Sequence, residues 1–328
     1  MKVRFMVIFI GIVFFLAAAY TSLFFFNFKG TPIYGVSFDP EYASYLLPNA
    51  GEGFLAVIND WNFKYIRLPA HWDQVEKTRG KYDFSDIDWY VDRAGDNDVK
   101  VMLALGQKTP RWPECHIPVW AKDLPHSVYR EELKRYISAT VEHYKNHPAL
   151  EFWQVENEPF LGFGSCRPMT VAEAKEEIEL VKRLDPRHKT ILSDSGELSL
   201  WGKSANVADL FGTTVYRKVW NKYVGVWSYK FLPASFYRFK LWLADRAPVE
   251  AFIIELQAEP WIAKHINEST PEELLSFVDR AVIQNNISYA QKIGLPRVYL
   301  WGAEWWYWLK LKGHNEIPDY IATLNRVP

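Results

Sequence analysis

Two glutamates at the ends of apolar, strand-like runs are the residues of this chain best suited to chemistry. Glu158 follows the run FWQVENEP at 152–159, and Glu255 ends the run FIIE at 252–255. A carboxylate at the end of a buried strand is costly to place there unless it is paired or has a chemical role. Two such groups at one rim can cleave a glycosidic bond with retention of configuration.

The retaining reaction sets a geometric requirement on these two glutamates. Their carboxyl groups must lie about 5–5.5 Å apart across the scissile bond. Like charges at that separation raise the pKa of one partner, so that one carboxyl stays protonated while the other stays ionised. The chain must therefore bring residues from distant strands to one end of the fold.

Eight short apolar runs, separated by helical patterns, can supply that arrangement. The runs are mostly continuous rather than alternating, as expected for parallel strands covered by helices. They lie at 32–37, 64–69, 99–105, 150–155, 189–193, 211–216, 250–255 and 296–302. Eight βα units over about 300 residues predict a (β/α)8 TIM barrel, formed as one domain by residues 29–328. A doubly wound sheet would normally carry a Gly-rich turn after its first strand, and GVSFD at 35–39 offers none.

Helix signals fall between the runs. Thr170 and Thr270 each begin a capping-box pattern, with Glu173 and Glu273 three residues later. Further helices are expected near 53–61, 86–97, 127–146, 233–246 and 316–325. The fifth unit, between the runs at 189–193 and 211–216, has the weakest helical signal.

With these elements in place, the sequence resembles clan A of the glycoside hydrolases, and within it the cellulase-type family 5 and its relatives. The resemblance rests on Asn157-Glu158-Pro159 after the fourth strand and on Glu255 at the end of the seventh. It extends from about residue 31 to the C-terminus. It implies that Glu158 is the general acid and then the base, that Glu255 is the nucleophile, and that Asn157 binds the sugar 2-hydroxyl.

The resemblance also implies roles for residues on three other strands. Arg67 would keep the nucleophile ionised, Tyr216 would donate a hydrogen bond to it, and Trp301 would form an aromatic platform under the sugar. Two departures from the family pattern leave the family and the substrate open. Gln257 stands where many members have glycine after the nucleophile, and Thr214 stands where a histidine usually precedes the tyrosine.

Other acidic residues are rivals for the catalytic roles. Glu156 lies on the same side of an ideal strand as Glu158, and a bulge at the strand end would let both Asn157 and Glu158 face the sugar. Glu259 and Glu304 are alternative nucleophiles, although both are expected in loops beyond the strand ends, where contact with substrate is the favoured role.

Several loop residues have the chemistry of sugar contacts, with simple packing as the alternative for each. They are His71, Trp72, Gln107, Trp112, Gln257, Glu304 and Trp305. Aromatic residues make up 16% of the chain, which favours a carbohydrate cleft. The cluster at 305–308 (WWYW) is expected to divide between cleft and core.

The N-terminus predicts a membrane segment within residues 1–28. Lys2 and Arg4 precede an uncharged run at 5–26, which is 22 residues long and would measure about 33 Å as a helix. A transmembrane helix in contact with the lipid bilayer is expected. The alternative is a signal peptide, cleaved near 17–19, which would release a secreted domain. In both cases the catalytic domain would be extracytoplasmic.

The two cysteines, Cys115 and Cys166, are expected in neighbouring loops, and outside the cytoplasm a disulfide between them is possible. The formal net charge is −1, which gives no electrostatic footprint for nucleic acid. No metal or cofactor motif occurs, and no Gly-x-Ser-x-Gly elbow indicates a serine esterase.

The sequence thus predicts a retaining β-glycosidase that acts on a β-linked oligo- or polysaccharide. A catalytically silent glycan-binding barrel and a transglycosylase with the same residues are the alternatives.

Overall fold

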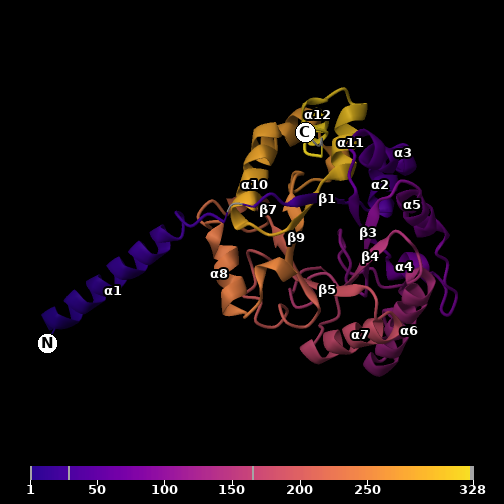
Figure 1. Ribbon diagram of the computed structural model, residues 1–328, viewed down its shortest axis with the longest axis horizontal. Coiled ribbons are helices and arrows are strands. Elements are labelled where there is room, and N and C mark those ends of the chain that lie inside the picture. Colours follow the sequence, from indigo (N-terminus) through magenta and orange to yellow (C-terminus); the bar gives the residue numbers. More distant parts are fainter. Residues whose placement is uncertain (1, 29, 165, 326–328) are drawn as a thin grey trace.

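The computed structural model describes residues 2–28, 30–164 and 166–325. Its centre is a closed barrel of eight parallel strands, in the order β1-β10-β9-β6-β5-β4-β3-β2 (Figure 1). The barrel strands are β1 (Ile33–Ser37), β2 (Tyr65–Pro69), β3 (Lys100–Leu105), β4 (Leu150–Val155), β5 (Lys189–Asp194), β6 (Leu210–Val215), β9 (Ala251–Gln257) and β10 (Arg297–Trp301). The predicted TIM barrel is confirmed, and all eight predicted strands are present.

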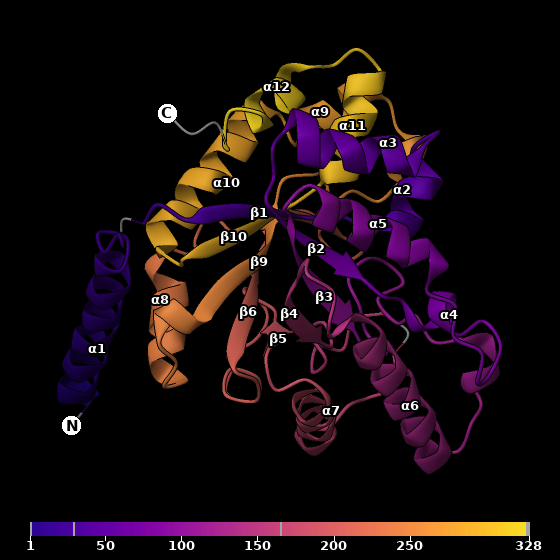
Figure 2. The same cartoon turned by 45° about the vertical axis from the view of Figure 1, so that its right-hand side comes forward.

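Helices surround the barrel, as Figure 2 shows from a second side. They are α2 (Pro40–Leu46), α3 (Ala50–Leu55), α4 (Trp72–Val75), α5 (Ser85–Asp96), α6 (His126–Tyr144), α7 (Val171–Leu184), α8 (Ser235–Leu243), α9 (Pro271–Phe277), α10 (Arg280–Ile293), α11 (Ala303–Leu311) and α12 (Glu316–Ile321). Shorter helical turns lie at η1 (Ala56–Asp60), η2 (Val119–Ala121), η3 (Pro248–Glu250) and η4 (Ile266–Glu268). Both predicted capping boxes form, at the starts of α7 and α9.

The fifth unit lacks a helix, in line with its weak signal: residues 195–209, all described, form turns between β5 and β6. Several elements were not predicted, including the following two. A hairpin of β7 (Lys218–Asn221) and β8 (Gly225–Ser228) follows β6, and helix α11 follows β10 directly. Glu304 therefore lies in the first turn of a helix and not in a loop.

The core has two parts because alternate side chains of each strand point to opposite faces. The larger part lies between the strands and the helices. A smaller cluster is formed by Met102, Ile191, Leu210, Phe252, Ile254 and Tyr299. These apolar layers support the strand ends, where the polar residues of the predicted site converge.

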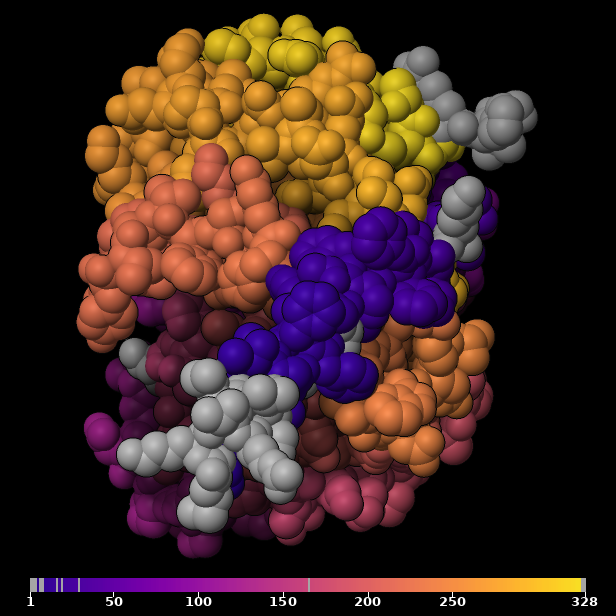
Figure 3. Space-filling view, turned by 90° about the vertical axis from the view of Figure 1, so that its left-hand side faces the viewer, coloured from indigo at the N-terminus to yellow at the C-terminus, as the bar shows by residue number. Residues whose placement is uncertain are grey.

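The N-terminal helix α1 (Lys2–Ser22) projects away from the barrel (Figure 1). After it, the chain packs on the barrel exterior: the Phe28 amide donates to the Lys292 carbonyl at 3.0 Å, and the Arg238 guanidinium lies 4.4 Å from the Phe28 ring. Figure 3 looks onto this side of the molecule, with N-terminal residues in indigo between orange segments of the C-terminal half and purple segments of the N-terminal half. In the part of the chain that the structure describes, no helix is both long and apolar enough to cross a membrane, so the predicted transmembrane helix at 5–26 is not borne out.

Candidate active site

A single buried arginine joins the two strand ends that carry the predicted catalytic glutamates. Arg67, on β2, donates from Nη1 to Glu255 Oε1 at 2.7 Å and from Nη2 to Asn157 Oδ1 at 2.9 Å. Its Nε donates to Gln154 Oε1 at 2.6 Å, and the residue is only 1% exposed. The planar guanidinium holds these acceptors with three separate nitrogens in a fixed fork, a geometry that the single nitrogen of a lysine does not provide. Residues 157 and 255, far apart in sequence, therefore face one end of the barrel.

Glu255 has two donors directed at its carboxyl group. Besides the Arg67 ion pair, its Oε2 accepts a hydrogen bond of 2.9 Å from the Tyr216 hydroxyl. Burial and the charge of Glu255 raise the pKa of Tyr216 far above its usual range, so the phenol remains a neutral donor. A carboxylate with a cation and a hydroxyl donor aimed at it suits the role of nucleophile.

Glu158 has the opposite electrostatic environment. Burial, followed by the nearby charges of Glu255 and Glu114, raises the pKa of Glu158 well above its usual range. The Thr214 hydroxyl donates to its Oε1 at 3.1 Å, and its backbone amide donates to Ser193 Oγ at 3.0 Å. A carboxyl that keeps its proton near neutral pH suits the role of general acid.

The backbone after β4 is kinked where the bulge was expected. Glu156 and Glu158 have left-handed φ values of 63° and 48°. Asn157 Oδ1 accepts hydrogen bonds from Arg67, Gln154 and Ser193. Left-handed backbone is uncommon outside glycine and marks a site held by its surroundings. It lets two consecutive residues, 157 and 158, both face the site.

The carboxyl group of Glu156, the alternative acid, is directed at the loop after β3. Its carboxylate accepts hydrogen bonds of 2.8 Å from the backbone amides of Gln107 and Lys108. Gly106 provides the space for this contact, because a Cβ there would lie 2.4 Å from Glu156 Oε1. Glu156 thus anchors the loop after β3 to the end of β4.

The loop after β3 supplies two charged residues that the sequence reading missed. Glu114 interacts with Asn157 and Glu255, and one of its carboxylate oxygens is buried without a hydrogen-bond partner. Burial, opposed by Lys108 and aided by Glu255, raises the pKa of Glu114 to about 7. Its position next to Cys115 was the only sequence signal that pointed to it.

The second residue is Arg111, which pairs with both rival nucleophiles. Its guanidinium forms ion pairs with Glu259 and, at 2.6 Å, with Glu304. Glu304 also accepts the Asp39 amide at 2.6 Å, and burial raises the pKa of Glu304 to about 7. Glu259 and Glu304 thus share one arginine, whereas Glu255 pairs with Arg67 and accepts a hydrogen bond from Tyr216.

Of the residues predicted to contact the sugar, some lie near the two glutamates and others support the loops around them. The Trp301 indole donates to Glu259 at 2.7 Å, and Trp112 is 64% exposed at the rim. Gln257 is buried and accepts the amides of Arg217 and Lys218, both at 2.9 Å, so it fixes the loop after β6.

Three residues predicted to contact the sugar are packed among other side chains. Trp72 is fully buried against Tyr136, and its indole donates to Glu76. Trp305 is likewise fully buried. Gln107 accepts the Tyr129 hydroxyl and donates to a backbone carbonyl. For these three residues the structure favours packing, the alternative that the sequence left open.

Cys115 and Cys166 form the predicted disulfide, with Cα atoms 5.3 Å apart. The bridge joins the loops that follow β3 and β4. It therefore connects the segment carrying Arg111 and Glu114 to the segment that follows Glu158.

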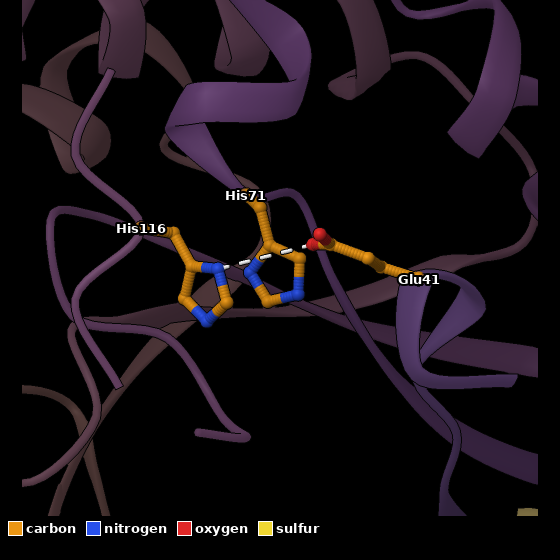
Figure 4. A group of neighbouring side chains, drawn as sticks. All are labelled: Glu41, His71 and His116. Atoms are coloured by element: carbon orange, nitrogen blue, oxygen red, sulfur yellow. Dashed lines mark ion pairs between the residues drawn. The ribbon is translucent and has the colours of Figure 1, made fainter. Parts of the chain in front are cut away.

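The fold gathers Glu41, His71 and His116, a group that could hold a metal and that the sequence did not indicate (Figure 4). Both His71 nitrogens already have partners, Thr109 Oγ1 at 2.7 Å and Asp39 Oδ2 at 2.9 Å. Although burial opposes it, Asp39 raises the pKa of His71. Burial and the neighbouring His71 charge lower the pKa of His116 to about 3. The cluster fits a hydrogen-bonded ion pair better than a metal site.

Comparison with known proteins finds sequence similarity to glycoside hydrolases. A sequence model of glycosyl hydrolase family 10 matches residues 68–173, a region that contains Glu158 but not Glu255. The beta-galactosidase BgaB of Geobacillus sp. (strain Y412MC61) is 28% identical over 156 residues, which cover 41% of this chain and 22% of that protein. The chain therefore matches only about a fifth of the length of this relative.

Solved structures share the fold at low sequence identity. Xylanase 10B from Thermotoga petrophila RKU-1 aligns with a TM-score of 0.55 and 17% identity, over 82% of this chain and 81% of that one. A GH5_18 protein from Bifidobacterium longum subsp. longum aligns with a TM-score of 0.58 and 13% identity, over 83% and 70%. These alignments show the barrel fold that the resemblance implied.

Proposed function

We propose that this protein is a retaining β-glycosidase that hydrolyses a β-linked oligo- or polysaccharide, with Glu255 as nucleophile and Glu158 as acid and base. The observation that carries the proposal is the contrast between the two carboxyls. Glu255 is held by Arg67 and Tyr216, whereas burial and nearby negative charge keep the proton on Glu158. Similar proteins include beta-galactosidases and a xylanase, which supports this reaction type.

In the first step, Glu158 donates its proton to the glycosidic oxygen while the Glu255 carboxylate attacks the anomeric carbon. The bond to the leaving group breaks, and a covalent glycosyl ester forms on Glu255. In the second step, ionised Glu158 takes a proton from water, whose oxygen attacks the anomeric carbon and releases Glu255. Asn157 precedes Glu158 and shares Arg67 with Glu255, a position from which its amide would bind the 2-hydroxyl.

Covalent trapping tests the proposal. Activated 2-deoxy-2-fluoro β-galactosides and β-xylosides should add one sugar mass to the peptide that contains Glu255. Glu255→Ala should abolish trapping and lower kcat on the order of 10⁴-fold or more without loss of fold. Glu151→Gln, which changes a glutamate paired with Arg297, is the matched control. Trapping on another residue, or full activity of Glu255→Ala, would contradict the assignment, and a glycan-binding barrel would show binding without trapping.

We also propose that the domain works outside the cytoplasm. The Cys115–Cys166 bridge supports this location, because such bonds persist in oxidising compartments. Lys2 and Arg4 before the uncharged run 5–26 would direct export, with that run either retained at the bilayer or cleaved. Digestion of the barrel by a protease added to intact cells, or to spheroplasts, tests this location.

A further inference from the structure

The turn after β5 contacts the end of β6 at two positions that matter for the site. The Gly196 amide donates to Thr214 Oγ1 at 3.2 Å, and Glu197 Oε1 accepts the Tyr216 amide at 2.9 Å. Thr214 and Tyr216 are the residues whose hydroxyl groups donate to the proposed acid and to the proposed nucleophile. Two consecutive residues of one turn therefore hold both of these hydroxyl donors.

The contact with Gly196 fixes the direction in which the Thr214 hydroxyl donates. A backbone amide can only donate, so Thr214 Oγ1 accepts from Gly196 and keeps its single hydrogen for Glu158 Oε1 at 3.1 Å. Only glycine permits this close approach, because a Cβ at residue 196 would lie 1.9 Å from the Thr214 carbonyl oxygen.

Glu197 holds Tyr216 by its backbone. Tyr216 directly follows β6, whose last pair with β9 is Val215 with Leu256. A buried backbone amide beyond the end of a strand still needs an acceptor, and the Glu197 carboxyl supplies it. The Tyr237 hydroxyl of α8 donates to the same oxygen of Glu197. The backbone from which the Tyr216 side chain projects is therefore fixed by a carboxyl that α8 holds in turn.

Helix α8 also supports the turn through Lys240, which is fully buried. The Lys240 ammonium donates to the carbonyls of Gly196 and Ser199, the latter at 2.9 Å, and lies 3.7 Å from the centre of the Trp201 ring. A buried ammonium group is costly unless its hydrogens are bonded. The fifth unit, which has no helix of its own between β5 and β6, thus has a turn that α8 holds in place.

We propose that Glu197 is a positioning residue of the reaction: by holding the backbone of Tyr216, it directs the Tyr216 hydroxyl at the nucleophile, Glu255. Glu197 acts on the reaction through Tyr216. This inference rests on the proposed function, and it goes further by giving the turn after β5 a part in catalysis.

The test substitutes Glu197 in the full chain. Glu197→Met keeps much of the side-chain volume but removes the acceptor, so kcat should fall about tenfold or more. The acid limb of kcat/KM should move to higher pH, because the Tyr216 hydroxyl then stabilises the ionised nucleophile less. Glu197→Gln, whose amide oxygen can still accept, should retain most of the wild-type kcat. A wild-type kcat and acid limb in Glu197→Met, or an equal loss of kcat in Glu197→Gln, would overturn the proposal.

Glu76→Met is the matched control. Glu76 is also a fully buried glutamate, and it accepts the Gly80 amide and the Trp72 indole, each at 2.7 Å. Glu76→Met should lower the free energy of unfolding and leave the acid limb of kcat/KM in place. If it moves the acid limb as far as Glu197→Met does, the effect of Glu197 is one of general stability, and the proposal is overturned.

A second background separates positioning from a merely structural role. In Tyr216→Phe, which has no hydroxyl to direct, Glu197→Met should cause little further change in kcat or in the acid limb. Equal losses of kcat with and without the Tyr216 hydroxyl would overturn the proposal. If the wild-type protein hydrolyses no aryl β-glycoside, the proposed function is contradicted. The crystal structure of Glu197→Met then decides the inference, which fails if the Tyr216 hydroxyl still lies within hydrogen-bond distance of Glu255.

Discussion

The hydroxyl of Thr214 donates a hydrogen bond to Glu158 Oε1 at 3.1 Å. Two residues later, Tyr216 donates to Glu255 at 2.9 Å. Residues two apart in an extended strand point to the same side, so the end of β6 presents one hydroxyl to each of the two carboxyls. The threonine that departs from the family pattern therefore has a contact with the proposed acid.

The Thr214 contact predicts a pH effect. A hydroxyl that donates to a carboxyl favours the ionised form, so Thr214→Val should raise the pKa of Glu158 further. Since activity requires protonated Glu158, the alkaline limb of kcat/KM should move to higher pH, and kcat at the optimum should fall about tenfold or less. Thr213→Val, at the preceding and oppositely directed position, is the control. If the alkaline limb of kcat/KM stays in place or moves to lower pH in Thr214→Val, the hydrogen bond from Thr214 to Glu158 does not lower the pKa of Glu158.

Glu114 predicts a shift in the opposite direction. Above its pKa of about 7 it carries a negative charge, which helps to keep the pKa of Glu158 raised. Glu114→Gln removes that charge, so the pKa of Glu158 should fall and the alkaline limb of kcat/KM should move to lower pH. The pH–rate profile measures this directly. Glu131→Gln, on the exposed face of α6, should leave the limb unchanged.

Position along a strand allowed part of this site to be predicted. Arg67, Glu255 and Trp301 lie on strands whose apolar runs are continuous and easily placed in order, so the end of the barrel that they share follows from the fold. The kink after β4 could be anticipated because an ideal strand cannot present both Asn157 and Glu158 to one side.

Loop geometry accounts for what could not be predicted. Arg111 meets Glu259 and Glu304 only because three loops from distant parts of the chain fold over the same side. Left-handed backbone at residues 111 and 114 directs these side chains inward, and single-sequence patterns do not specify such a backbone for arginine or glutamate. The burial of Trp72 and Trp305 likewise depends on packing partners from other helices.

The hydrogen bonds of Arg67 predict that a positive charge at this position is not sufficient for full activity. The bonds to Gln154, Glu255 and Asn157 come from three different nitrogens of Arg67, an arrangement that the single lysine nitrogen does not reproduce, so Arg67→Lys should lower kcat about 10²-fold or more. Arg297→Lys is a matched control, since Arg297 forms two hydrogen bonds of 2.6 Å to Glu151 away from the site. It should lower stability with little change in kcat. Equal effects of the two substitutions on kcat would show that Arg67 has only a structural role.

Removal of the disulfide is expected to change both the free energy of unfolding and the pH dependence of kcat/KM. It closes a loop of 51 residues, for which chain entropy gives a stabilisation of about 4 kcal/mol as an upper value. Replacing both cysteines by alanine should therefore lower the free energy of unfolding by about 2–4 kcal/mol in urea denaturation. Because Glu114 adjoins Cys115, loosening the bridge should also move the alkaline limb of kcat/KM toward that of Glu114→Gln. Unchanged stability together with an unchanged pH profile would show that the bridge neither stabilises the barrel nor positions Glu114.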